Sequence, residues 1–68
     1  MLAHAMAAVE SLPDNQRAVV TLRDIEGLGA AETCAILDLS DANQRILLHR
    51  GRTRVRAALN QVLSPPLP

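Results

Sequence analysis

Arginine supplies the side chains of this 68-residue chain that are best suited to chemistry with an anionic partner. Five of the seven arginines follow residue 41, namely Arg45, Arg50, Arg52, Arg54 and Arg56. The guanidinium group stays charged, and its planar fork donates paired hydrogen bonds to a phosphate or to a guanine edge. Because the first 41 residues hold all seven acids and two arginines, the net charge of zero divides into −5 and +5. This asymmetry predicts an anionic partner for the second half.

Catalytic and metal-binding groups are sparse by comparison. The single cysteine, Cys34, has no partner for an internal disulfide, and with only His4 and His49 it does not make a zinc site. Asp24 and Glu26 lie two residues apart and point to different sides of a helix. Since the chain has no Phe, Tyr or Trp, it also lacks aromatic platforms for bases or cofactors. We expect no enzyme activity, no metal, no cofactor and no small-molecule substrate.

The length allows one domain with one small core. No basic and then apolar leader opens the chain, and no apolar run approaches the roughly 18 residues that a membrane span needs. A lone cysteine suits a reducing compartment. These features predict a cytoplasmic chain with no membrane partner.

The spacing of apolar residues predicts an all-α chain with no sheet. A first short helix is expected over residues 2–11, ended by Leu12-Pro13. Asp14 is expected to cap a second helix, which turns Val19, Leu22 and Ile25 inward and stops at the glycines that follow.

A third helix is expected over residues 30–37, with small packing residues that include Ala31, Cys34 and Ala35. Gly29, Ala35 and Leu39 suit a close crossing of this helix with the next. Cys34 is expected to be a small buried apolar residue rather than a reactive thiol.

The turn at residues 38–40 leads to the fourth and longest helix. Asp38 tolerates a left-handed backbone, and Ser40 or Asp41 can cap a helix that runs to Val62. The prolines after Ser64 cannot continue it, so we expect a domain over residues 1–63 and a flexible tail over residues 64–68.

A helical wheel of this fourth helix separates an apolar face from a basic face. The apolar arc contains Leu47, Leu48, Gly51, Val55, Ala58, Leu59 and Val62. The opposite side displays Arg45, Ile46, His49, Arg50 and Thr53, with Arg52 and Arg56 beside them. One face should be buried, and the other is available to a partner.

A short helix, a tight turn and a longer helix with a basic outer face are typical of a helix-turn-helix, whose second helix fits the DNA major groove. Arg45 and Arg50 are expected to read guanine edges or to bind phosphates. The three arginines from Arg52 to Arg56 are better placed for the DNA backbone.

Other interpretations of this face stay open. An arginine-rich helix face is often only solvated, and His49 is equally compatible with an ordinary surface role and with a DNA contact. Ile46 is an apolar side chain on a polar face, where it could contact a thymine methyl group, contact a partner protein, or contact nothing.

Several segments together resemble region 4 of bacterial sigma factors of the extracytoplasmic-function (ECF) group. They are Leu12-Pro13, Gln16-Arg17, Leu22 to Leu28, Ala31 to Leu37, Leu39-Ser40, Leu48 to Arg52 and Val55-Arg56. The resemblance covers about residues 9–60. It implies a four-helix domain of the winged-helix-like sigma region 4 type, which recognises double-stranded promoter DNA at the minus-35 element and docks on the β flap of RNA polymerase. It also implies that an anti-sigma factor could cover these surfaces.

By the same resemblance, the base-reading segment falls on Asn43, Gln44, Arg45, Ile46, His49 and Arg50, with Arg52 and Thr53 further along the helix. Ala31 and Glu32 would lie beside the DNA backbone.

The chain departs from the family pattern in three places. Asp38 stands where glycine is usual, Asn43-Gln44 replace a Thr-Val pair, and Ile46-Leu47 replace a polar residue followed by a basic one. These differences bear on which promoter sequence is read. The family's region 2 is missing, so the chain resembles one domain of a longer factor.

Two alternatives accompany this interpretation. One is the helix-turn-helix of response regulators, which shares the four-helix layout. The other is a protein-interaction module that docks on polymerase or an anti-sigma factor through apolar residues such as Leu2, Met6, Leu59 and Leu63.

Overall fold

The computed structural model describes the backbone of residues 2–63 and the side chains of residues 3–61. The elements are α1 (Leu2–Glu10), α2 (Asp14–Val20), the π-helical turn η1 (Thr21–Ile25), α3 (Ala30–Leu37) and α4 (Asp41–Leu63). The described part of the chain contains no strand, so the predicted all-α fold is confirmed. The tail predicted over residues 64–68 lies outside the described residues. None of the described helices is long and apolar enough to cross a membrane.

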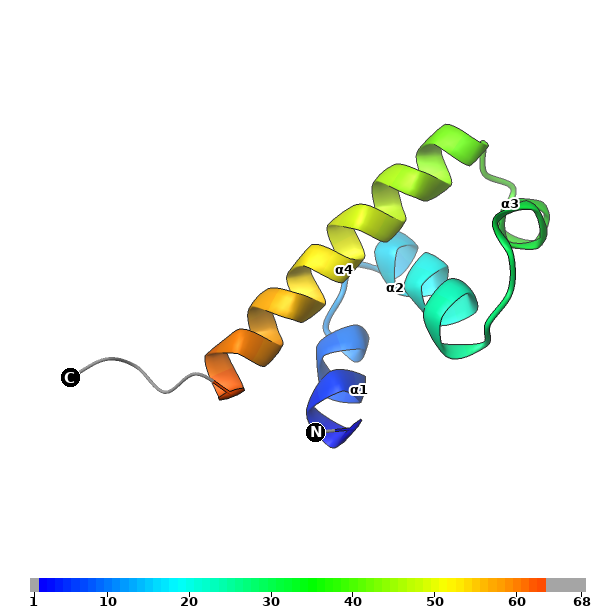
Figure 1. The fold of residues 1–68 in the computed structure, drawn as a ribbon. Coiled ribbons are helices and arrows are strands. Elements are labelled where there is room, and N and C mark those ends of the chain that lie inside the picture. Colours follow the sequence, from blue (N-terminus) through cyan, green and yellow to red (C-terminus); the bar gives the residue numbers. More distant parts are fainter. Residues whose placement is uncertain (1, 64–68) are drawn as a thin grey trace.

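Helix α4 organises the fold, because α1, α2 and α3 all pack against it. Figure 1 shows α1 and α2 on the same side of α4, with α3 beside its N-terminal end. Val9, Leu12, Val19, Val20 and Leu48 form the buried core between α1, α2 and α4. Leu37, Leu39, Leu47 and Val55 pack around that core and extend it toward α3.

The second helix differs from its prediction at both ends. Pro13, not Asp14, occupies the N-cap position, and Asp14 instead pairs with Arg17 at 2.9 Å. The helix also loosens at η1, where Glu26 N donates to Thr21 O, five residues back, at 2.8 Å. This wider turn changes which side chains face inward. Ile25, predicted to be buried, is therefore 44% exposed, whereas Val20 is buried.

Helices α2 and α4 approach most closely at Gly51. A Cβ atom built there would lie 2.5 Å from Val20 Cγ2 and 3.6 Å from Gln16 Cβ. For the other crossing, of α3 with α4, the sequence predicted contacts at Gly29, Ala35 and Leu39. Leu39 does pack against the core, but a Cβ on Gly29 would meet nothing within 4 Å and Ala35 is exposed, so the prediction is wrong for these two residues.

One side chain of α3 is fully buried, although the sequence pattern did not predict it. Thr33 is fully buried, and its hydroxyl donates to Gly29 O at 2.9 Å. Cys34 is only partly buried, and Ala31 is exposed rather than packed. The reason is that α3 presents a single narrow strip to its neighbours, so the small side chains on its other sides stay in solvent.

Candidate nucleic-acid interface

Helices α3 and α4 and the turn between them form the predicted helix-turn-helix. Asp38 adopts the left-handed conformation that the sequence predicted, with φ of 55°. Leu39 N then donates to Cys34 O at 3.0 Å, and the Leu39 side chain packs against the core. Ser40 caps α4, because its hydroxyl accepts a hydrogen bond from Asn43 N at 3.1 Å. The direction in which α4 leaves the turn is thus fixed by backbone and side-chain bonds together.

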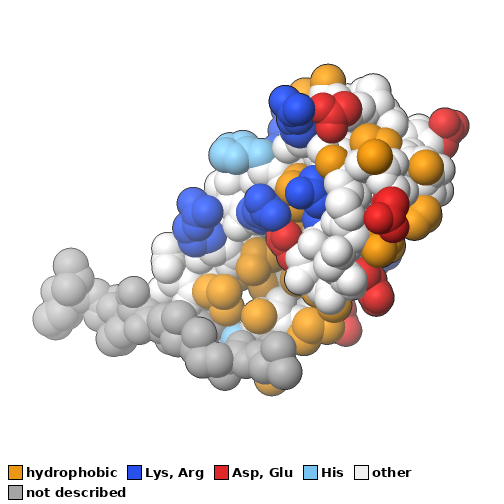
Figure 2. Space-filling model, turned by 45° about the vertical axis from the view of Figure 1, so that its right-hand side comes forward, with side chains coloured by type: hydrophobic (Ala, Val, Ile, Leu, Met, Phe, Trp, Pro, Cys, Tyr) orange, Lys and Arg blue, Asp and Glu red, His pale blue; other side chains and the backbone are white. Residues whose placement is uncertain are grey.

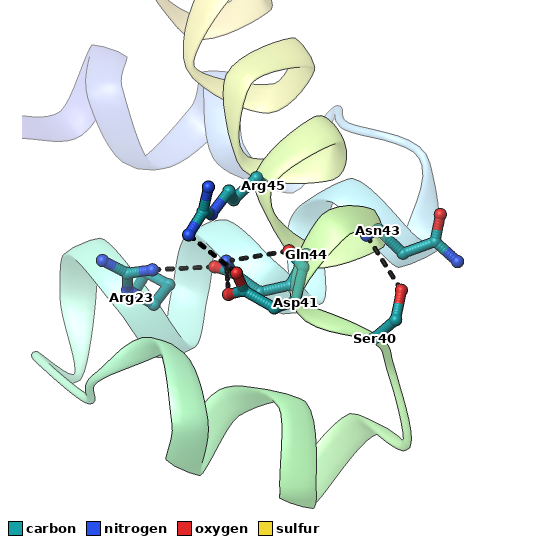
Figure 3. Close-up of polar contacts among 6 residues, drawn as sticks. All are labelled: Arg23, Ser40, Asp41, Asn43, Gln44 and Arg45. Atoms are coloured by element: carbon teal, nitrogen blue, oxygen red, sulfur yellow. Dashed lines mark hydrogen bonds and ion pairs between the residues drawn. The ribbon is translucent and has the colours of Figure 1, made fainter.

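Gln44 does not lie on the outer face of α4. It is 1% exposed, and its Oε1 accepts a hydrogen bond of 2.7 Å from Arg23 Nη1 (Figure 3). Its Nε2 donates to Asp41 Oδ1 at 3.3 Å and to Asp41 O at 3.4 Å. The prediction that Gln44 contacts a base is therefore wrong, because its side chain is buried and its polar atoms are occupied.

The sequence held a signal for this burial that the residue type concealed. Gln44 lies four residues before Leu48 and seven before Gly51, which is the spacing of the buried stripe of α4. Arg23, 21 residues away, satisfies the amide there. Gln44 therefore holds the first turn of α4 in place through its contacts with Arg23 and Asp41, and it does not face a DNA base.

Arg45 lies one residue further on and stays in solvent. Its side chain is 76% exposed, and Nη2 pairs with Asp41 Oδ2 at 2.8 Å (Figure 3). An exposed pair one turn apart on a helix is worth only about 0.3–0.5 kcal/mol. Arg45 can therefore exchange this carboxylate for another anion at little cost.

Arg52 is engaged more firmly, by Asp24 of η1. Its Nε and Nη2 donate to the two carboxylate oxygens at 2.9 Å and 2.6 Å. These hydrogen bonds hold the pKa of Asp24 below its ordinary value, against a smaller opposing effect of burial, and raise the pKa of Arg52. The pair joins η1 to α4 through the Nε–Nη2 edge of the guanidinium group alone, and the Arg52 side chain is 48% exposed. The predicted contact of Arg52 with the DNA backbone therefore stays a prediction.

The remaining residues of the predicted face are exposed on α4 or at the start of α3. They are Ala31, Glu32, Asn43, Ile46, His49, Arg50 and Thr53. Among the side chains that the structure describes, no acid pairs with Arg50, Arg54 or Arg56. Figure 2 shows basic side chains and a histidine gathered along one side of the molecule, with most of the acids in view on the other. Their contacts with DNA remain predictions.

A second feature is an apolar hollow of about 260 Å³ between α1, η1 and α4. It is lined by Ala5, Met6, Val9, Val20, Asp24, Ile25, Arg52 and Val55. Met6 is 40% exposed at its edge, as is Ile25 at 44%. The Asp24–Arg52 pair closes one side of this hollow. Leu2 and Leu63, which the sequence predicted for such a surface, lie outside the described side chains.

Comparison with known proteins identifies the family to which this sequence belongs. A family described as "Sigma-70, region 4" matches residues 4–55. The ECF RNA polymerase sigma factor SigE of Mycolicibacterium smegmatis is 44% identical over 54 residues, which are 79% of this chain and 21% of the relative. ShbA of Streptomyces griseus, also named an ECF RNA polymerase sigma factor, is 39% identical over 59 residues, or 87% and 31%.

SigM of Bacillus subtilis, with the same description, is 36% identical over 53 residues, or 78% of this chain and 32% of the relative. The chain thus spans about a fifth to a third of the length of these curated relatives. No solved structure matches it significantly.

Proposed function

Because the chain belongs to region 4 of the ECF group of sigma-70 factors, we propose that it reads the minus-35 element of a promoter and docks on the β flap of RNA polymerase. The observation that carries this proposal is the exposed polar face of α4, which begins directly after a rigid turn. A single helix has the width to enter the major groove, where base edges are distinguishable. Promoter reading would also place the chain in the cytoplasm.

In this proposal the base contacts come mainly from the first three turns of α4. Arg45 and Arg50 donate to guanine edges or phosphates, and the Asn43 amide reaches an adjacent base. Ile46 meets a thymine methyl group, and His49 and Thr53 follow along the groove. Ala31 and Glu32 lie beside the DNA backbone, since both are exposed in the first turn of α3. Gln44 is a positioning residue, which orients α4 without touching DNA, whereas Arg52 pairs with Asp24 through one edge and keeps Nη1 for the DNA backbone.

The apolar hollow between α1, η1 and α4 supports the docking part of the proposal. It is lined by Arg52 and Val55 of α4 and by none of the residues proposed to contact bases. Polymerase and DNA could therefore bind at the same time. An anti-sigma factor that used the hollow would compete with the β flap.

The experiment that tests this function is selection of bound duplexes from a random library, by the chain fused to a β flap fragment. We expect a short enriched motif that Arg45→Ala degrades at one or two positions, at a cost of about 1–3 kcal/mol on the selected site. The matched control is Arg17→Ala, which removes an equal charge from α2 and should leave the motif unchanged. Flap binding with no enriched motif would refute promoter reading and leave docking as the function.

A further inference from the structure

A second hollow lies between α2 and the outer face of α4. Its volume is about 420 Å³, and it is lined by Gln16, His49, Arg50, Thr53 and Arg54. Four of these side chains come from successive turns of α4, and Gln16 comes from α2. The lining contains two guanidinium groups, an imidazole and a hydroxyl, and no carboxylate. These are the donor groups that bind phosphate in proteins.

The amide of Gln16 is the buried end of this hollow. Gln16 is 8% exposed, and its Oε1 has no hydrogen-bond partner among the described residues. Gln16 lies where α2 packs against α4 at Gly51, with its Cβ 3.6 Å from the place of a glycine Cβ. A buried acceptor without a donor is unfavourable, so Oε1 favours a nearby N–H donor, which Arg50 and Arg54 of the same lining can supply.

Arg50 and Arg54 give this hollow an uncompensated charge. They lie one helical turn apart, where two like charges repel each other. Arg17, Arg45 and Arg52 each pair with an acid, but no such pair involves Arg50 or Arg54 in the described part of the chain. An anion between the two guanidinium groups would remove the repulsion.

We propose that this hollow binds a backbone phosphodiester group of duplex DNA, beside the bases that α4 contacts. A guanidinium turned into the hollow donates one N–H to Gln16 Oε1 and keeps its other donors for the phosphate oxygens. The Thr53 hydroxyl and the His49 ring complete the donor set. The inference rests on the proposed function. It adds Gln16, and it separates Arg54 from Arg56, which the sequence had both predicted to lie at the DNA backbone.

The first test uses inorganic phosphate and needs no DNA. Signals of the arginine Nε–H groups and of the Gln16 amide are followed by NMR while phosphate replaces chloride at constant ionic strength. Arg54 and Gln16 should shift in a saturable way, and Arg56, two residues from Arg54 and outside the hollow, should not. Gln16→Met keeps the length of the side chain but removes the Oε1 acceptor. It should abolish the selective phosphate-induced shift of the Arg54 signal. Equal shifts of Arg54 and Arg56 would overturn the proposal.

The second test identifies the source of the phosphate. Arg54→Ala and Arg56→Ala remove the same charge from α4, and affinity for the selected duplex is measured with the flap fusion. We expect a loss of about tenfold for Arg54→Ala and less than about threefold for Arg56→Ala. Neutral methylphosphonates are then placed one at a time along the duplex. One position should weaken the unaltered chain but leave Arg54→Ala unaffected.

The outcomes separate this inference from the proposed function. A motif that depends on Arg45, with equal losses for the two alanine variants, keeps promoter reading and overturns the phosphodiester site. Selective binding of free phosphate without a sensitive DNA position also overturns it, since the ligand is then a small anion. Absence of any base preference refutes promoter reading, and the phosphate titration still decides whether the hollow binds phosphate.

Discussion

The start of α4 and its middle use the same residue type in opposite ways. At the start, Asp41 pairs with Arg45, and Gln44 is bonded to Arg23. In the middle, Arg50 and Arg54 have no acid partner in the described structure, although they belong to the same helix. The chemistry of arginine is identical in both places. What differs is the acceptor within reach. The buried amide of Gln44 and the Asp24 carboxylate make Arg23 and Arg52 part of the fold. Arg50 and Arg54, and Arg45 with its exposed pair, stay available to a partner.

The largest expected effect comes from breaking the buried bond at the start of α4. Arg23→Ala leaves Gln44 Oε1 buried without a donor, and should lower the free energy of unfolding by about 1–3 kcal/mol. Urea unfolding followed by circular dichroism measures this. Arg54→Ala, in the middle of the same helix, should stay within about 0.5 kcal/mol.

A second variant distinguishes the orphaned amide from a general loss of charge. Replacing both partners, as in Arg23→Ala with Gln44→Leu, should restore most of the lost stability, because no polar group is then buried alone. A double variant as unstable as Arg23→Ala alone would contradict the role given to this hydrogen bond.

A smaller effect is expected where α2 meets the middle of α4. Gly51→Ala places a methyl group 2.5 Å from Val20 Cγ2. Overpacking costs about 1–3 kcal/mol, and the better helix propensity of alanine returns about 1 kcal/mol. We expect a net loss of up to about 2 kcal/mol in thermal or urea unfolding.

Gly29→Ala is the matched control for this steric argument. Its Cβ would meet nothing within 4 Å, and its φ of −76° suits alanine. It should change stability by less than about 1 kcal/mol, because the lower chain entropy of alanine is offset by the preference for glycine at this N-cap. Equal destabilisation by the two substitutions would show that glycine flexibility, and not close packing, matters at Gly51.

The smallest effect concerns the pair that joins η1 to α4. The pKa of Asp24 is lowered in the folded chain, chiefly by its hydrogen bond with Arg52, so its charged form stabilises the fold. This contribution is complete above about pH 4, the ordinary range of the group, and is lost as the pH falls through the lower folded-state value. Because both side chains are partly exposed, we expect it to stay below about 1 kcal/mol.

Unfolding measured from about pH 2 to about pH 7 tests this, with Asp24→Asn as the variant. The range is wide because the stability that depends on the charge of Asp24 is lost over a few pH units. The free energy of unfolding of the unaltered chain should exceed that of Asp24→Asn near neutral pH, and the difference should disappear in acid. A difference that is constant over the whole range would mean that the charge of Asp24 contributes nothing.

The sequence predicted the parts of this fold that depend on local bonds. The bounds of α3 and α4 followed from the turn at Asp38 and from the cap at Ser40, and the structure confirms both. The buried positions of Leu48 and Gly51 followed from helical spacing alone. Such features depend on residues within a few positions of one another, which a single sequence displays.

The features that the sequence did not predict depend on distant partners or on backbone irregularity. The resemblance places Gln44 in the base-reading segment, although its spacing from Leu48 matches the buried stripe of α4. Its hydrogen-bond donor, Arg23, is 21 residues away, so no local pattern indicates that a buried amide would be satisfied there. Asp24 and Arg52 are 28 residues apart, so no local pattern announces their pairing. Ile25 is exposed because η1 widens the turn before it, and no glycine or proline within η1 marks that change.

Because of its length, α4 also converts a small tilt at the Gly51 contact into a larger displacement of its first turn. This helix has 23 residues, and Gly51 lies near its middle, about 12 Å along the axis from Asn43. At that distance a tilt of about 5° about Gly51 moves the first turn of α4 by about 1 Å. Gly51, which has a hydrogen atom where alanine has a methyl group, thus permits the angle at which α4 packs against α2. If α4 reads a promoter as proposed, substitutions at this buried point will shift promoter preference without altering any of the proposed DNA contacts.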